Sequence, residues 1–191
     1  MAGALGTRLL IRFSFSTKMY QEVLMNFYKG DMVMHWSHGI GQIVNLEERA
    51  LAGEKAVYYV VQVRDMTVWV PADSKVGSRL RPPTSKARFQ RMLAILSSPT
   101  ELLPEDRLER KTRLQELLQD GRPESLCQII RDLSAYQKKL GKPMNDNDQM
   151  ILKQARNTLL GEWGFVLSVT PAQAEHELYR MLTSSLVEAE T

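Results

Sequence analysis

The sequence holds few side chains of the kinds that catalysis or metal binding requires. Its histidines are His35, His38 and His176, and its one cysteine is Cys127. A zinc site of four cysteines, or of two cysteines and two histidines, cannot be assembled from this set. The close spacing of His35 and His38 favours a turn or hydrogen-bonding role, and the apolar neighbours of Cys127 favour a core thiol. We therefore expect no metal, no cofactor and no catalytic residue.

The glycines at positions 39 and 41 do not indicate a phosphate-binding loop. Gly39-Ile40-Gly41 lacks the third glycine and the lysine of such loops, and it precedes a predicted strand instead of a helix. These glycines favour a tight turn and a bulge. A small hydrolase or transferase thus has no supporting set of residues.

Positive charge is concentrated in two segments. Residues 75–91 carry six cations and no acid, and they are Lys75, Arg79, Arg81, Lys86, Arg88 and Arg91. This segment fits either a solvated seam between domains or a contact with the phosphate backbone of a nucleic acid. In residues 105–113 the cations alternate with acids, as is typical of ion pairing on a helix surface. The last helix and the tail are acidic, so we expect DNA to avoid that end of the chain.

Length and composition limit the architecture. The 191 residues suffice for one ordinary domain or two small ones, and 43% hydrophobic with 25% charged residues is typical of a folded protein. A single cysteine fits a reducing compartment, and no apolar run reaches the ~20 residues that span a bilayer. We therefore expect a cytoplasmic protein.

The first half of the chain predicts short antiparallel strands. Runs rich in Val, Ile, Tyr and Trp cover residues 31–36, 40–47, 56–64 and 66–70, with turn residues between them. This pattern predicts a small Tudor-like or SH3-like β-barrel. Alternation along the fourth run places Trp69 outward if its valine neighbours face the core, although packing under the helices is an alternative for this side chain. The expected inward residues are Val33, Ile43, Val44, Tyr59, Val61 and Val68.

After Arg81-Pro82-Pro83 the hydrophobic period changes to that of α-helices. We expect about five helices, over residues 85–96, 104–119, 123–140, 146–167 and 171 onward, with Leu108 and Trp163 among the core residues. Thr170-Pro171-Ala172-Gln173 has the pattern of a capping box. The fold class is therefore α+β, a small antiparallel barrel followed by an all-α domain.

The predicted domains are residues 28–83 and 84–186, with a tail over 187–191. Residues 1–27 are expected to be a poorly ordered extension. Within it, residues 1–24 resemble a targeting peptide only faintly, and initiation at Met19 or Met25 is an alternative.

Several motifs resemble the CarD family of transcription regulators. They are Lys29-Gly30-Asp31-Met32-Val33, His38-Gly39-Ile40-Gly41-Gln42-Ile43, Ala52-Gly53-Glu54-Lys55, Met66-Thr67-Val68-Trp69-Val70-Pro71, Ile130-Arg131-Asp132-Leu133 and Lys153-Gln154-Ala155-Arg156. The similarity covers about residues 28 to 185. It implies a bacterial regulator without enzymatic turnover, which binds the β subunit of RNA polymerase through the Tudor-like domain. The helical domain would contact promoter DNA at the upstream edge of the transcription bubble and stabilise the open complex.

The resemblance also implies the site residues. The polymerase-binding set is Arg49, Trp69, Glu48 and Thr67, and the DNA-binding set is Lys86, Arg88, Arg107, Arg110, Lys111 and Arg113. The resemblance also implies a monomer that is associated with the nucleoid through RNA polymerase.

Two departures from the family pattern affect this expectation. Arg107 stands where many members carry a tryptophan wedge, so we expect weaker bubble stabilisation or a different promoter dependence. His35-Trp36 stands where the family usually has Tyr-Pro, so the first turn can be built differently. The alternative function is a protein adaptor that binds polymerase or another protein without productive DNA contact.

Overall fold

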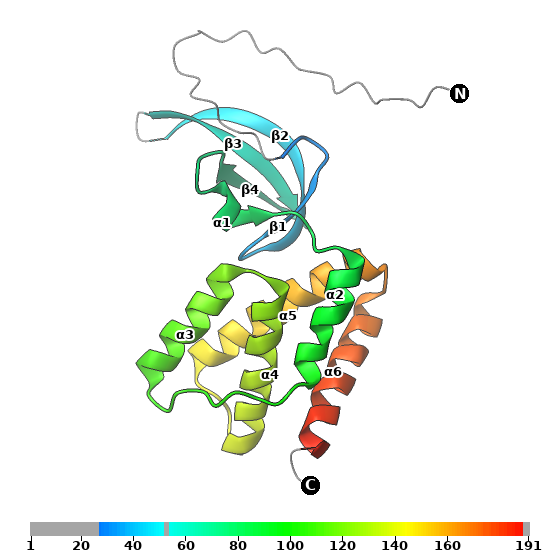
Figure 1. The fold of residues 1–191 in the computed structure, drawn as a ribbon. Helices are drawn as coiled ribbons and strands as arrows, with labels where there is room; N and C mark the ends of the chain where they lie inside the picture. The colour runs from blue at the N-terminus through cyan, green and yellow to red at the C-terminus, as the bar shows by residue number, and fades with distance from the viewer. Residues whose placement is uncertain (1–26, 52–53, 189–191) are drawn as a thin grey trace, which may run out of the picture.

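The computed structural model describes residues 27–51 and 54–188. The expectations for residues 1–26, and for the tail beyond residue 188, lie outside this range. Five antiparallel strands form one sheet of order β4-β3-β2-β1-β5, and the helices follow in sequence (Figure 1). The strands are β1 (Met32–His35), β2 (Gly39–Leu51), β3 (Glu54–Val63), β4 (Met66–Pro71) and β5 (Leu80–Arg81). The chain therefore has the predicted α+β class.

The core of the sheet agrees with the predicted alternation at most positions. Val33, Ile43, Tyr59 and Val61 are fully buried, and Val68 packs partly buried against them. Val44 was predicted to face inward, and this is wrong. The register with β3 shifts between Ile43 and Asn45, so a β-bulge takes Val44 out of the alternation.

The first turn is held by His35, as its predicted hydrogen-bonding role requires. His35 Nδ1 accepts hydrogen bonds from the backbone N–H groups of Ser37 at 3.2 Å and His38 at 3.3 Å. Burial, together with the nearby His38, lowers the pKa of His35 from 6.5 to about 4. The Trp36 N–H donates to the Arg79 carbonyl at 3.1 Å, a bond that a proline at this position could not make.

Six α-helices and one 3-10 helix make up the rest of the described chain. They are α1 (Val76–Arg79), α2 (Lys86–Met92), the 3-10 helix η1 (Leu93–Ser97), α3 (Arg107–Asp120), α4 (Pro123–Leu140), α5 (Asp146–Leu167) and α6 (Pro171–Glu188). The predicted helix over residues 85–96 is therefore α2 continued by η1. The helix predicted from residue 104 begins later, because the Asp106 side chain accepts from the N–H groups of Leu108 and Glu109 and caps α3.

The helices enclose a second apolar core, separate from that of the sheet. Cys127 and Trp163 are buried in it as predicted, and burial raises the pKa of the Cys127 thiol. Leu108 was predicted to be a core residue, and this is wrong, since its side chain is 71% exposed. It lies in the first turn of α3, whose buried residues are Arg110, Leu114 and Leu118. None of the described helices has the length and apolar character needed to cross a membrane.

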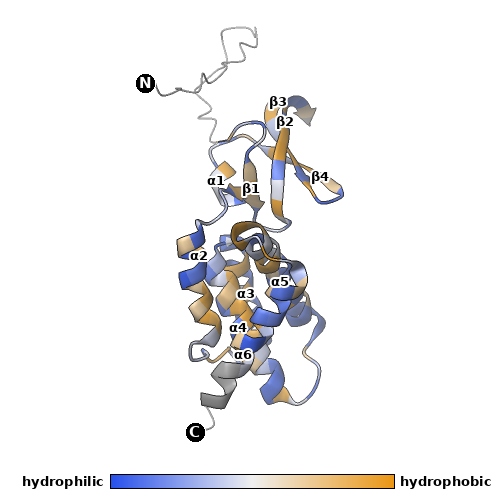
Figure 2. Cartoon of the chain, turned by 90° about the vertical axis from the view of Figure 1, so that its right-hand side faces the viewer, coloured by the Kyte–Doolittle hydropathy of each residue, from blue (hydrophilic) through white to orange (hydrophobic). Residues whose placement is uncertain are grey.

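The sheet rests on one end of the helical bundle, with α5 beneath it (Figures 1 and 2). An added Cβ on Gly161 of α5 would lie only 3.6 Å from Ile40 Cγ2, and one on Gly121 would lie 3.3 Å from Trp36 Cβ. The first distance is an ordinary van der Waals contact, whereas the second is tight, so glycine at position 121 permits the close approach of the two parts of the chain.

Candidate functional site

The exposed face of the sheet carries a compact group of three side chains from β2 and β4. Because side chains alternate along a strand, Glu47 and Arg49 lie on one face of β2. Trp69 of β4 lies opposite Val60 of β3 and extends over this same face, with 39% of its surface exposed. The predicted outward orientation of Trp69 is therefore confirmed.

Glu47 joins the other two members of this group. Its Oε2 accepts hydrogen bonds from Trp69 Nε1 and from Arg49 Nε, both at 3.1 Å. The Arg49 guanidinium lies 4.1 Å from the centre of the Trp69 ring, within the range of a cation–π contact. The bond from Trp69, followed by the bond and charge of Arg49, lowers the pKa of Glu47. We call Glu47, Arg49 and Trp69 the Arg-Trp cluster; it presents a flat ring and a charge in fixed relative positions.

The predicted polymerase-binding residues divide between the two faces. Thr67 shares the face of Trp69 and donates to Gln62 Oε1 at 2.9 Å. Glu48, by contrast, alternates to the opposite face and pairs with Lys55 at 3.3 Å. Sequence reasoning chose Glu48 and missed Glu47, although the two-residue spacing from Arg49 is the signal that would have identified it.

Arg110 is not available for the predicted contact with DNA. Its side chain is 2% exposed, and its Nε donates to the Asp148 carboxylate of α5 at 3.0 Å. Its Nη1 donates to the Pro104 carbonyl at 2.7 Å, and its guanidinium lies 5.0 Å from the Tyr136 ring centre. The alternation of charges suggested a surface position, but the partner of Arg110 comes from a distant helix that the local pattern does not reveal.

Two further predicted cations are held in ion pairs at the surface. Arg88 of α2 pairs with Glu124 at 2.8 Å, and Arg113 of α3 pairs with Glu101 at 2.5 Å. Both line a hollow of about 600 Å³ over α4, together with Arg122, which sequence reasoning missed. Arg122 is paired with Asp120 at 2.7 Å. The lining also carries four carboxylates, Glu116, Asp120, Glu124 and Asp132, against these three arginines, so the hollow has no excess of positive charge.

The remaining predicted cations are exposed and free of ion pairs. Lys86, Arg107 and Lys111 have no carboxylate partner within the described part of the chain. Exposed Leu108 follows Arg107 directly at the start of α3. These positions could contact phosphates, since free ammonium and guanidinium groups are the side chains that such contacts use.

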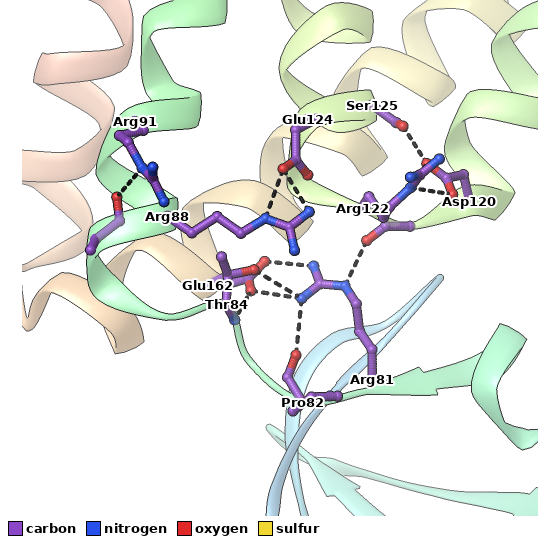
Figure 3. Close-up of polar contacts among 12 residues, drawn as sticks. Arg81, Pro82, Thr84, Arg88, Arg91, Asp120, Arg122, Glu124, Ser125 and Glu162 are labelled. Carbon is purple, nitrogen blue, oxygen red and sulfur yellow. Dashed lines mark hydrogen bonds and ion pairs between the residues drawn. The ribbon is translucent and has the colours of Figure 1, made fainter.

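The cationic segment 75–91 serves in part as a seam between the sheet and the helices. Arg79 pairs with Asp73 at 2.7 Å, and Arg81 pairs with Glu162 of α5 at the same distance (Figure 3). Of the two interpretations left open by the sequence, the seam is confirmed for Arg81. In residues 27–51 and 54–188 no group of three or more His, Cys, Asp or Glu side chains could hold a metal ion.

A small sheet with an exposed Arg-Trp cluster is joined to a bundle with exposed cations, so the protein presents two candidate binding surfaces on two parts of its fold. Residues 27–82 match the model of the CarD-like/TRCF RID domain, and residues 91–179 match the model of the CarD C-terminal domain. The chain belongs to the CarD family, a family of transcription factors with an RNA-polymerase-interaction domain. It is 27% identical over 152 residues to the Bacillus subtilis (strain 168) protein described as "Putative transcription factor YdeB", covering 77% of this chain and 96% of that protein.

Proposed function

We propose that this protein binds the β subunit of bacterial RNA polymerase through the Arg-Trp cluster and contacts promoter DNA through its helical part. The contact would lie at the upstream edge of the transcription bubble and modulate the stability of the open complex. The observation that carries the proposal is the Arg-Trp cluster itself, which lies within the matched polymerase-interaction domain. Exposed aromatic and arginine side chains held in place are typical anchors of protein interfaces.

The proposed binding of polymerase is tested by capture of purified core polymerase on the immobilised full chain. Arg49→Glu and Trp69→Ala should each weaken capture by about tenfold or more, because each removes an anchor of the interface. Lys29→Glu, an equal reversal of charge at an exposed residue outside the cluster, is the matched control and should leave capture unchanged. Capture that is indifferent to all three substitutions would reject the assignment of this surface.

The proposed contact with promoter DNA depends on the predicted cations that are free of ion pairs. Replacing Lys86, Arg107 and Lys111 together by alanine should shorten the lifetime of the open complex while leaving polymerase capture intact. Arg110 is excluded from this set because it is buried. The proposed monomeric state is checked on the same samples by sedimentation.

A protein adaptor without productive DNA contact is the second candidate. It is favoured by the ion pairs of Arg88 and Arg113 and by the acids that outnumber the arginines in the hollow over α4, because both reduce the positive charge available to DNA. If the triple alanine variant leaves the open-complex lifetime unchanged while polymerase capture persists, the adaptor is the better description.

A further inference from the structure

Arg81 joins the sheet to the helical bundle at two places. It ends β5, where the chain leaves the sheet, and its Nη1 and Nη2 donate to Oε1 and Oε2 of Glu162 at 2.8 and 2.7 Å (Figure 3). Its Nε donates to the carbonyl of Gly121, between α3 and α4, at 3.0 Å. One guanidinium therefore fixes the sheet to α5 and to the end of α3.

Both carboxylate oxygens of Glu162 accept hydrogen bonds at this joint. Its side chain is 0% exposed, and its Oε1 also accepts from the Thr84 N–H at 2.8 Å. The pair is bidentate, a geometry that fixes both distance and direction. A buried ion pair of this kind contributes little net stability compared with apolar packing, and its best-attested use is to specify one arrangement over others.

The other contacts at the seam come mainly from the packing of β2 against α5. Among the described residues, the two buried apolar clusters share no member. Gln154 Nε2 donates to the Ser37 carbonyl at 3.5 Å, and Gly161 and Gly121 approach Ile40 and Trp36 closely. Among the contacts described here, the Arg81–Glu162 pair is the bidentate ion pair, and its two parallel hydrogen bonds restrain direction as well as distance.

We propose that Arg81 and Glu162 are positioning residues that fix the direction of the helical domain relative to the Arg-Trp cluster. This inference rests on the proposed function, in which the two parts contact polymerase and DNA at once. When two contacts are linked, the second depends on the effective concentration that the link provides. A fixed joint keeps the free cations of α2 and α3 directed toward the DNA as soon as the sheet is bound.

The test compares the wild-type chain with Arg81→Gln/Glu162→Gln. The double substitution removes both charges together, because Arg81→Gln alone would leave a buried carboxylate without its partner. Residual dipolar couplings should report one relative orientation for the wild type and a spread of orientations for the variant. Polymerase capture should be unchanged, whereas the open-complex lifetime should fall about tenfold. A variant that keeps both the single orientation and the lifetime would overturn the proposal.

A reversible cross-link separates positioning from folding. In Trp36→Cys/Gly121→Cys the two Cβ atoms would lie 3.3 Å apart, slightly closer than the roughly 3.5 Å lower end of disulfide geometry, so a small shift lets the bridge form. Cys127 is buried and cannot compete. Added to the double glutamine variant, the oxidised bridge should restore the orientation and the lifetime, and reductant should abolish both. Gly121 has a positive φ of 62°, so a cysteine at this position is strained. The two cysteines are therefore also placed in the chain that keeps Arg81 and Glu162, as a control for the effect of this strain.

Failure of the oxidised bridge to restore the lifetime, with orientation restored, would overturn the positioning role. If the wild-type chain has no effect on open complexes, the proposed function fails, and the dipolar couplings still decide whether the pair sets the orientation.

Discussion

Glu47 and Glu48 are neighbours on β2 and lie on opposite faces of the sheet, which makes them a matched pair for mutation. Glu47→Ala should weaken polymerase binding about three- to tenfold, because Arg49 and Trp69 then lose the acceptor that holds them together. Glu48→Ala should have little effect, since Glu48 contacts only Lys55 at the surface. Titration calorimetry with the polymerase β lobe measures both. Equal weakening by the two substitutions would contradict a positioning role for Glu47.

Arg110 and Lys111 are also adjacent, and their substitution should affect different properties: stability for Arg110 and DNA binding for Lys111. Arg110→Ala leaves the buried Asp148 carboxylate without its cation, so the free energy of unfolding should fall by about 3 kcal/mol or more. Lys111→Ala should leave stability within about 0.5 kcal/mol of the wild type and weaken DNA binding instead. Urea denaturation and fluorescence anisotropy with labelled DNA give the two readouts. The assignment fails if the stability losses are similar.

His35 should make stability depend on pH. Its pKa is about 4 in the folded protein and 6.5 without the fold, so the unfolded chain takes up the proton first as the pH falls. The contribution of neutral His35 to the free energy of unfolding is therefore fully present above pH 6.5 and is lost as the pH decreases toward 4. After allowance for solvent screening, this loss amounts to about 1–2 kcal/mol.

Urea denaturation of His35→Asn tests this dependence, because asparagine offers an acceptor oxygen but does not titrate in this range. The loss of stability between pH 7 and pH 4.5 should be smaller by about that amount in the variant. His176→Asn, at an exposed position of α6, is the control. An unchanged pH profile for His35→Asn would rule out this histidine as the source.

Single residues were predictable where one local rule decides their environment. Trp69 followed from strand alternation, and the cores around Cys127 and Trp163 followed from helical periodicity. Arg110 did not, because its partner Asp148 lies 38 positions away and no local pattern links the two. The same holds for Arg81 and Glu162, which are 81 positions apart.

At the scale of elements, the cap of α3 controls the segment that presents Arg107. Asp106→Ala removes an acceptor for two N–H groups and a negative charge at the helix N-terminus, and it should destabilise the protein by about 1 kcal/mol. Glu105→Ala, next to it and exposed, is the control. Thermal unfolding measures the difference, and equal shifts for both would show that the cap contributes nothing specific.

Element ends were predictable where capping residues mark them. Thr170 and Gln173 form the predicted capping box, Asn145 caps α5, and α4 covers its predicted range. The bulge at Val44 and the 3-10 end of the first helix were not predictable, because each depends on packing against another part of the chain.

At the scale of the whole molecule, cations that form ion pairs with acidic side chains are less available to phosphates, which should limit the salt dependence of DNA binding. Among the predicted DNA-binding residues, the three free cations imply a slope of log K against log salt of about −3. Exchange of the Arg88 and Arg113 ion pairs for phosphate contacts would make the slope steeper, about −4.5. Anisotropy titrations of the full chain at several salt concentrations measure this slope. A slope near zero would exclude phosphate contacts and favour the adaptor.

The two partners of the Arg81–Glu162 joint come from the two separately matched regions, residues 27–82 and 91–179. This has a consequence for chimeric proteins. A hybrid that takes its sheet from one family member and its helices from another inherits half of the joint from each parent. Such a hybrid should keep the promoter behaviour of its helical parent only when the sheet carries an arginine at the position of Arg81 and the helices carry a glutamate at the position of Glu162. The design of a hybrid should therefore check this pair first.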